Sequence, residues 1–195
     1  LATIDDKTPT AAEEIWDGLD GTGIGGLVGA AGNTGVFNYV NSFAGMTFNG
    51  AARKGSGTAN SDGSSSGAGQ SAWDFALTGS GDTMGVDGLA WGVGYGVAEA
   101  GEQSNLSGVD DNDEHMTVFA NYSTGPVTFG AQLSDIRSGS NGTASETTEA
   151  FGIAFNVNDD LSISYGEREV EFGTAGGTHV TEEGDGIAIA YTMGS

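Results

Sequence analysis

The chain has 195 residues, with 5 Lys and Arg residues against 27 Asp and Glu residues, a formal net charge of −22, and no cysteine. That charge argues against nucleic acid as a partner, because its binding depends on lysine and arginine contacts to phosphate, and against electrostatic docking onto anionic lipid. Zero cysteine excludes a disulfide framework and thiolate chemistry.

The first predicted element in chain order is a short acidic helix within residues 4–18, "IDDKTPTAAEEIWDG". Its start has two interpretations. Thr8 caps the helix with Pro9 at the first helical position, or Thr10 and Glu13 form a capping box. A helix of about eight residues is not stable alone, so we expect it to pack against another part of the protein.

The helix has two unlike sides. Its apolar side consists of Ile15, Trp16 and Leu19. The remainder carries carboxylates, which are Asp5, Asp6, Glu13, Glu14 and Asp17. Rings of carboxylates favour cations in pores, whereas on a surface loop the same groups would only be solvated. The sequence of this segment alone leaves both interpretations open.

The rest of the chain predicts about nine β-strands, because apolar residues alternate with small or polar residues with a period of two. In "PVTFGAQLS", for example, Val127 and Phe129 share one face, and Thr128 and Gly130 share the other. The predicted strands span residues 34–43, 46–54, 71–79, 88–98, 114–123, 126–137, 147–157, 161–172 and 184–193. The sequence therefore predicts an all-β protein.

Short and long connections alternate along these strands, which is typical of an up-and-down antiparallel β-barrel that crosses a membrane. The strands have about the length that a tilted transmembrane strand needs. Their non-apolar face consists mostly of Gly, Ala, Ser, Thr and Asn, which suits a water-filled lumen, and its glycines leave room for a segment packed against the wall. No apolar run is long enough for a transmembrane helix, and no signal-peptide pattern opens the chain.

Two further groups of charged residues are candidates for a site. By strand parity Arg53 and Arg168 face the lumen, where they would be the basic residues opposite an acidic segment. In "DDNDE", the carboxylates of Asp110, Asp111 and Asp113 are candidate weak ligands for calcium, which takes six to eight oxygens. Their spacing is not that of an EF-hand, and a solvated acidic loop is the alternative.

The stretch of residues 116–167, which contains "ANYSTGPVTFGAQLSD" and "FGIAFNVNDDLSISYGE", resembles Gram-negative general porins, especially those of α-proteobacteria. The opening "IDDKTPTAAEEIWDGL" followed by "GVFNYVNSFAGMTFNGA" is similar to the porin order of constriction loop, strand, short turn and strand. No single motif carries the resemblance, which covers the chain as a pattern.

The resemblance implies a homotrimer of sixteen-stranded barrels in the outer membrane, in contact with lipid and lipopolysaccharide. It implies that residues 1–33 are a constriction loop folded into the barrel and that residues 34–195 are strands six to fourteen of a single domain. The chain would then be an internal fragment, incomplete at both ends; the alternative is a complete mature chain. A final strand ending in Phe, which the family has, is missing here.

These features favour a pore for passive diffusion of small hydrophilic solutes and ions, with a preference for cations, without catalysis and without a cofactor other than the calcium considered above. The alternative function is a soluble, calcium-dependent bacterial surface or adhesion protein, which the acidic balance, the glycine content and the lack of cysteine would also fit. A calcium-binding β-roll needs G-G-x-G-x-D repeats, and these are absent from the sequence.

Overall fold

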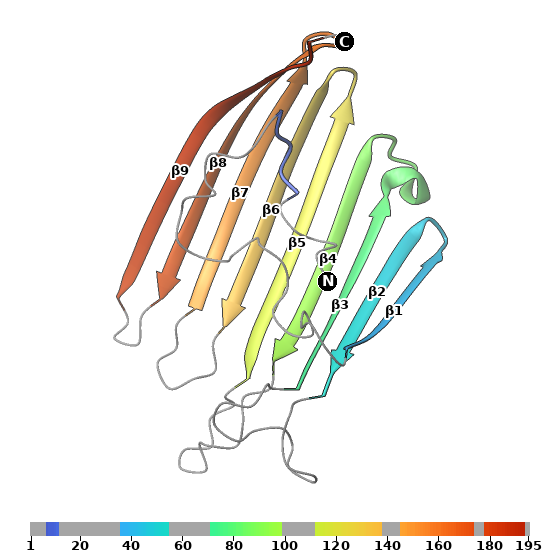
Figure 1. Ribbon diagram of the computed structural model, residues 1–195, viewed down its shortest axis with the longest axis vertical. Helices are drawn as coiled ribbons and strands as arrows, with labels where there is room; N and C mark the ends of the chain where they lie inside the picture. The colour runs from blue at the N-terminus through green and yellow to red at the C-terminus, as the bar shows by residue number, and fades with distance from the viewer. Residues whose placement is uncertain are drawn as a thin grey trace.

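In the computed structural model, the described residues are 7–11, 36–54, 71–98, 112–137, 145–173 and 178–193. They form one antiparallel sheet in which each strand pairs with the next along the chain (Figure 1). The strands are β1 (Val36–Phe43), β2 (Met46–Arg53), β3 (Ala72–Ser80), β4 (Leu89–Ala98), β5 (Asp113–Thr124), β6 (Val127–Arg137), β7 (Ser145–Asn156), β8 (Leu161–Gly173) and β9 (His179–Tyr191). The nine predicted strands and their up-and-down order are confirmed.

The start of β9 differs from the prediction, which placed it at residue 184. In the structure β9 begins at His179, which pairs with Gly173, and Thr181 pairs with Glu171. The added part of β9, residues 179–183, contains a single apolar residue, Val180, which pairs with Phe172, so no apolar alternation marks the extension in the sequence. Backbone pairing with β8 extends the strand there, and pairing needs no apolar side chains.

The short connections use residues that suit tight turns. Ala44 and Gly45 join β1 to β2 with φ values of 48° and 76°, as a two-residue hairpin of the type I′ class requires. Between β7 and β8, Oδ1 of Asn158 accepts hydrogen bonds from the backbone N–H groups of Asp160 (2.9 Å) and Leu161 (3.0 Å). The β3–β4 connection contains a short 3-10 helix, η3 (Gly81–Met84), which ends at a left-handed Gly85.

The sheet is inverted relative to a soluble protein, because its apolar face is exposed and its polar face is buried. Within the described part of the chain, the buried hydrophobic cluster consists of Ala76 and Phe119 alone. The buried polar residues of the strands share one face, and most of the large exposed apolar residues of the strands lie on the other, with Val40 and Val180 as exceptions. The buried polar residues are Asn49, Asp74, His115, Thr117, Gln132, Ser134, Thr148, Ser164 and Arg168. We call the face with the buried polar residues the inner face and the other the outer face.

The outer face carries a continuous band of large apolar side chains. Phe129, Leu133 and Phe151 are 40%, 48% and 40% exposed, and Ile187 on β9 is 67% exposed. On β1–β4 the band is aromatic: the rings of Tyr39, Phe48, Phe75, Trp73 and Tyr95 form a chain of neighbours with centroids 5.5–6.4 Å apart. A contiguous apolar surface of this size marks contact with lipid or with another protein.

The apolar band has different heights on different strands. On β4 it runs over residues 89–97, which is about the length that a tilted transmembrane strand needs. On β8 it runs only over residues 161–165, after which Glu167, Glu169 and Glu171 face outward. The outer face of β7–β9 therefore changes from apolar to acidic partway along the strands.

The sheet is open in the structure, with β1 and β9 at its two edges among the described strands. Closure into a barrel and a total of sixteen strands are therefore predictions. No helix among the described residues is long and apolar enough to span a membrane.

Candidate functional site at the inner face

The inner face carries a row of glycines that crosses four strands. Gly130 on β6 pairs with Gly152 on β7, Gly152 pairs with Gly166 on β8, and Gly166 pairs with Gly186 on β9. Because the paired residues of neighbouring strands point to the same face, the row is a shallow channel without side chains. Its sides are formed by the adjacent inward residues of the same strands, among them Gln132 and Ser164.

Residues 7–11 lie across this row, far from β6–β8 in the sequence but on their inner face in space (Figure 1). We call this segment the strap. The backbone N–H of Lys7 donates to Oε1 of Gln132 (2.7 Å), and Nδ2 of Asn121 donates to the carbonyl of Lys7 (2.6 Å). At the other end, the N–H of Ala11 donates to Oγ of Ser164 (2.7 Å). The strap is thus held from β5 to β8.

Pro9, at the middle of the strap, occupies the space that side chains would fill at two of the glycines. A Cβ atom added at Gly152 would lie 2.8 Å from the carbonyl oxygen of Pro9 and 3.0 Å from its Cδ. A Cβ atom at Gly130 would collide with the Pro9 ring and with Oδ1 of Asn121. The prediction that wall glycines leave room for a packed segment is therefore supported at these two positions.

Behind the strap, a hydrogen-bonded cluster joins β5 to β6. Gln132 is completely buried, and its Nε2 donates to Oγ1 of Thr117 (3.2 Å). The same Oγ1 accepts from Oγ of Ser134 (2.8 Å) and donates to the carbonyl of Leu133 (3.3 Å). The cluster satisfies polar groups that the strap shields from water, as buried polar groups require.

The five predicted acidic residues flank the strap in the sequence. They are Asp5, Asp6, Glu13, Glu14 and Asp17, and all of them lie outside the described residues. The described strap residue Thr8 is 5% exposed, so this part of the predicted loop is packed against the sheet. Residues 9–11 are not helical, so the predicted helix start with Thr8 as cap and Pro9 as first helical residue is wrong. The helix that would start at Thr10 lies outside the described residues beyond Ala11, and its role at a constriction stays a prediction.

Both predicted basic residues lie on the inner face. Arg53 pairs with Ala72 on β3, and Arg168 lies between Ala150 on β7 and Gly184 on β9. Arg168 is only 7% exposed. The small residues Ala150 and Gly184 on both sides of Arg168 leave space for its long side chain, and strand parity alone was sufficient to assign the face of both arginines.

Other charged residues also lie on the inner face, and except for Asp113, a predicted calcium ligand, they were not predicted as site residues. Asp74 on β3 and His115 on β5 lie in one row with Gly96 of β4 between them, and they are 2% and 1% exposed. Strand parity places further carboxylates on this face, which are Asp113, Glu146 and Glu182. Assigning each charged strand residue to a face by strand parity could have found all of them. On the described inner face, carboxylates outnumber arginines.

The calcium prediction is not tested by the structure. Asp110 and Asp111 lie outside the described residues, and Asp113 is the first residue of β5. The described residues contain no group of three or more His, Cys, Asp or Glu side chains that could hold a metal ion. Calcium binding at this loop therefore stays a prediction.

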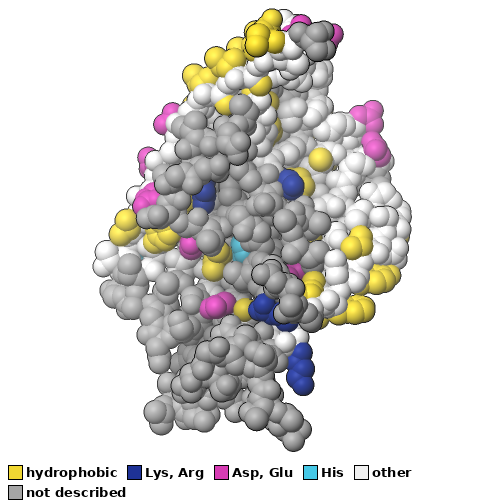
Figure 2. Space-filling model, viewed as in Figure 1, with side chains coloured by type: hydrophobic (Ala, Val, Ile, Leu, Met, Phe, Trp, Pro, Cys, Tyr) yellow, Lys and Arg dark blue, Asp and Glu magenta, His cyan; other side chains and the backbone are white. Residues whose placement is uncertain are grey.

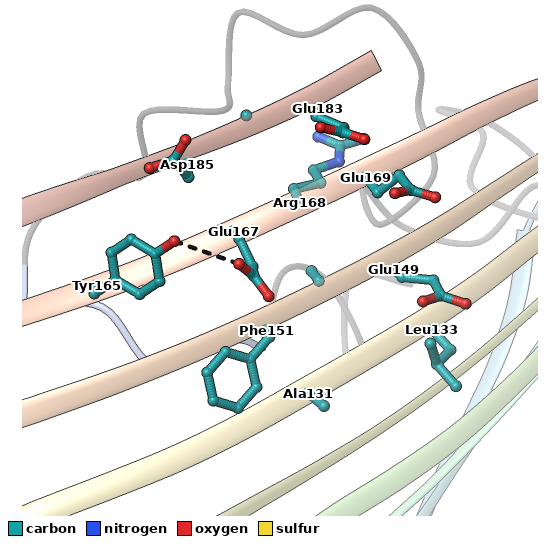
Figure 3. Close-up of a pocket in the computed structure, with 12 residues that line it drawn as sticks. Ala131, Leu133, Glu149, Phe151, Tyr165, Glu167, Arg168, Glu169, Glu183 and Asp185 are labelled. Atoms are coloured by element: carbon teal, nitrogen blue, oxygen red, sulfur yellow. Dashed lines mark hydrogen bonds between the residues drawn. The ribbon is translucent and has the colours of Figure 1, made fainter. Parts of the chain in front are cut away.

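A separate pocket of about 470 Å³ lies on the outer face of β6–β9 and not on the inner one (Figure 3). Its apolar residues include Leu133, Phe151 and Tyr165, and the hydroxyl of Tyr165 donates to Oε2 of Glu167 (3.3 Å). Carboxylates surround this apolar part, including Glu149, Glu167, Glu169, Glu183 and Asp185. The pocket marks the boundary at which the outer face becomes acidic.

Viewed from the strap side, hydrophobic side chains lie mainly along the rim of the molecule, and most of the basic side chains in view lie closer to its middle (Figure 2). A sheet that exposes an apolar outer face, buries a polar inner face and carries a segment across that inner face has the design of a membrane-spanning β-barrel wall. The fold and the site thus define the class of protein.

Residues 2–195 match the family model described as Gram-negative porin. The chain belongs to this family, and it is a protein of the bacterial outer membrane. No curated protein matches the sequence. Among solved structures the chain is similar to OmpT (folded in vitro), an outer membrane protein of Vibrio cholerae, with 11% sequence identity and a TM-score of 0.47. The match covers 78% of this chain and 53% of that one, so the chain spans about half the length of that relative.

Proposed function

We propose that this chain forms part of a water-filled outer-membrane channel for passive diffusion of small hydrophilic solutes and ions. The observation that carries the proposal is the position of the strap: residues 7–11 lie on the polar inner face, while large apolar residues are exposed on the other face. An inner face with polar groups and glycines suits water and a packed loop. The mechanism is diffusion, and it involves no covalent chemistry.

The strap supports the wider proposal that residues 1–33 are an inward-folded constriction loop. The predicted carboxylates flank residues 7–11 in the sequence on both sides. Asp5, Asp6, Glu13, Glu14 and Asp17 would then place negative charge in the narrowest part of the lumen. Arg53 and Arg168 on the wall are the basic groups that such carboxylates would face, and the arginines would give the constriction a transverse field.

We propose a preference for cations over anions. The carboxylates Asp74, Asp113, Glu146 and Glu182 on the described inner face outnumber the two arginines Arg53 and Arg168, and the predicted loop adds acidic residues. Rings of Asp and Glu raise the local concentration of cations in a pore. Sixteen strands and a homotrimer in contact with lipopolysaccharide remain part of the proposal through the family.

The test is conductance of the full-length protein in planar lipid bilayers. We expect discrete conductance steps, and a reversal potential in a KCl gradient whose sign shows that K⁺ is more permeant than Cl⁻. A reversal potential of the opposite sign at neutral pH would refute the cation preference. Absence of any conductance from folded protein would refute the channel itself.

The alternative, a soluble calcium-dependent surface protein, is disfavoured by the exposed apolar band. A soluble sheet would leave Phe129, Leu133, Ile187 and their neighbours in water without a second layer over them. Solubility without detergent distinguishes the two functions, because a soluble protein stays monodisperse in calcium-containing buffer and a membrane barrel aggregates.

A further inference from the structure

We propose that Gln132, Gly130 and Gly152 are positioning residues that fix the height and the depth of the strap on the wall. The free cross-section of the lumen at this level would then be set by the wall and not by the side chains of the strap. This proposal rests on the proposed function only in its consequence for conduction. The attachment itself is a separate, measurable property.

The height of the strap is determined by contacts to its backbone. The shortest hydrogen bonds to the wall use the N–H and carbonyl of Lys7 and the N–H of Ala11. The hydroxyl of Thr10 adds a longer one to Ser164 (3.4 Å). All residue types except proline have both a backbone N–H and a carbonyl group. These contacts therefore do not require particular side chains at positions 7 and 11. The specific partners are the side chains of Asn121, Gln132 and Ser164 on the wall.

Gln132 is the central partner because both ends of its amide are used. Oε1 accepts from Lys7, and Nε2 donates to Thr117. Oγ1 of Thr117 donates to the carbonyl of Leu133, so it accepts from the Gln132 amide and fixes the orientation of that amide. The acceptor Oε1 then faces the strap. A leucine at this position would keep the volume and lose both contacts.

The depth of the strap is determined by the two glycines. Pro9 lies directly over Gly130 and Gly152, and a Cβ atom at either position would enter the space of Pro9. Proline has no backbone N–H, so it can lie flat against bare backbone without leaving a donor unpaired. A side chain at Gly152 would move the strap away from the wall, and the only free direction is into the lumen.

A disulfide between the strap and the wall reports this attachment without any need for conduction. Oγ1 of Thr10 lies 3.4 Å from Oγ of Ser164, so the double substitution T10C/S164C places two sulfur atoms within bonding reach. The sequence shown has no cysteine of its own. In the full-length protein, made cysteine-free elsewhere, we expect mild oxidation to close this bond, seen as a mobility shift on non-reducing gels.

Three substitutions on this background test the positioning. Gly152→Val is expected to block closure, and Gly152→Ala to slow it if the larger variant does not fold. Gln132→Leu is expected to slow closure of the disulfide about fivefold, which corresponds to the loss of the one hydrogen bond between Gln132 and the strap. Ala131→Val is the matched control, because it enlarges a neighbouring residue on the exposed outer face and leaves the strap untouched. Heat-dependent gel mobility identifies the folded fraction.

The outcomes separate the two proposals. Fast closure in the parent and in Ala131→Val, with slow closure in the Gly152 and Gln132 variants, supports the positioning roles. Equal closure in all folded variants, or no closure in the parent, overturns them. If the disulfide results agree with the proposal and the same protein does not conduct in bilayers, the channel function fails and the positioning stands. If it conducts, Gly152→Val is expected to have a lower single-channel conductance than Ala131→Val.

Discussion

The backbone N–H of Lys7 donates a 2.7 Å hydrogen bond to Oε1 of Gln132, a side chain 125 residues away that is completely buried in the middle of β6. The bond joins the only described segment that precedes the sheet to the inner face of the sheet. Through this contact the strap at the start of the chain becomes a part of the inner face.

Removing the second contact of Lys7 is expected to destabilise the protein. Asn121→Leu deletes the 2.6 Å bond from Nδ2 to the Lys7 carbonyl and leaves that shielded carbonyl without its partner, which costs about 1–3 kcal/mol. Urea unfolding of the full-length protein in lipid vesicles measures the change in free energy of unfolding. Ser162→Ala removes an exposed hydrogen bond to Asn156 and is expected to cost less. An equal loss in free energy of unfolding for both variants would show that the strap contact contributes no more than an exposed hydrogen bond.

Charge placed on the outer face is expected to be costly. Val93 lies at the centre of the outward apolar run of β4, so Val93→Arg places a guanidinium near the middle of the bilayer and costs about 2–4 kcal/mol. Thr128→Arg, on the inner face of β6, is the control and should cost much less, because that side chain reaches water in the lumen. The measurement is folding stability in vesicles. Similar losses for both variants would contradict the assignment of the faces.

Trp73 is expected to touch lipid. It is 40% exposed on the outer face of β3, next to the rings of Phe75 and Tyr95. In a variant that retains only this tryptophan, brominated acyl chains should quench its fluorescence. A variant whose single tryptophan is introduced by Thr128→Trp on the inner face should keep its emission. Quenching of both to the same extent would argue against an inner face that is shielded from lipid.

Ion selectivity is expected to depend on carboxylates of the loop and not on those of the outer face. Neutralising the loop with Glu13→Gln, Glu14→Gln and Asp17→Asn should lower the permeability ratio of K⁺ to Cl⁻, because these charges lie within the proposed constriction. The matched control is Glu149→Gln, Glu167→Gln and Glu169→Gln, which removes the same charge from the outer face. Reversal potentials measure both. A larger change in the control would place the selectivity outside the lumen.

Substitutions of Ala44 in the first hairpin turn are expected to stabilise the protein. Ala44 has a φ of 48°, a conformation that costs a residue with a Cβ atom about 1 kcal/mol or more. Ala44→Gly or Ala44→Asn should relieve this strain, since glycine and asparagine adopt it readily. Gly45→Ala, at a φ of 76°, should have the opposite effect. Unfolding midpoints of the three variants give the comparison, and a destabilised Ala44→Gly would show that the turn is not strained.

Strand positions and faces were predictable from the sequence, because alternation with a period of two is a local property of the chain. The parity of Val127, Phe129 and Gln132 determines which of them share a face, and the structure confirms it. The same parity placed Arg53 and Arg168 on the inner face. The start of β9 was missed, because residues 179–183 contain a single apolar residue, Val180, and their backbone pairing with β8 leaves no alternation in the sequence.

The sequence by itself thus determined the strands, their order, the inverted distribution of polarity and, through resemblance, the family. Only the tertiary structure decided which wall residues receive the strap. Gln132, Asn121 and Ser164 look in the sequence like any other polar residues of the inner face. Register between strands brings Gly130 and Gly152 side by side, and the fold brings Pro9 onto them from more than a hundred residues away. Such contacts depend on the register of whole strands, and local alternation contains no information about it.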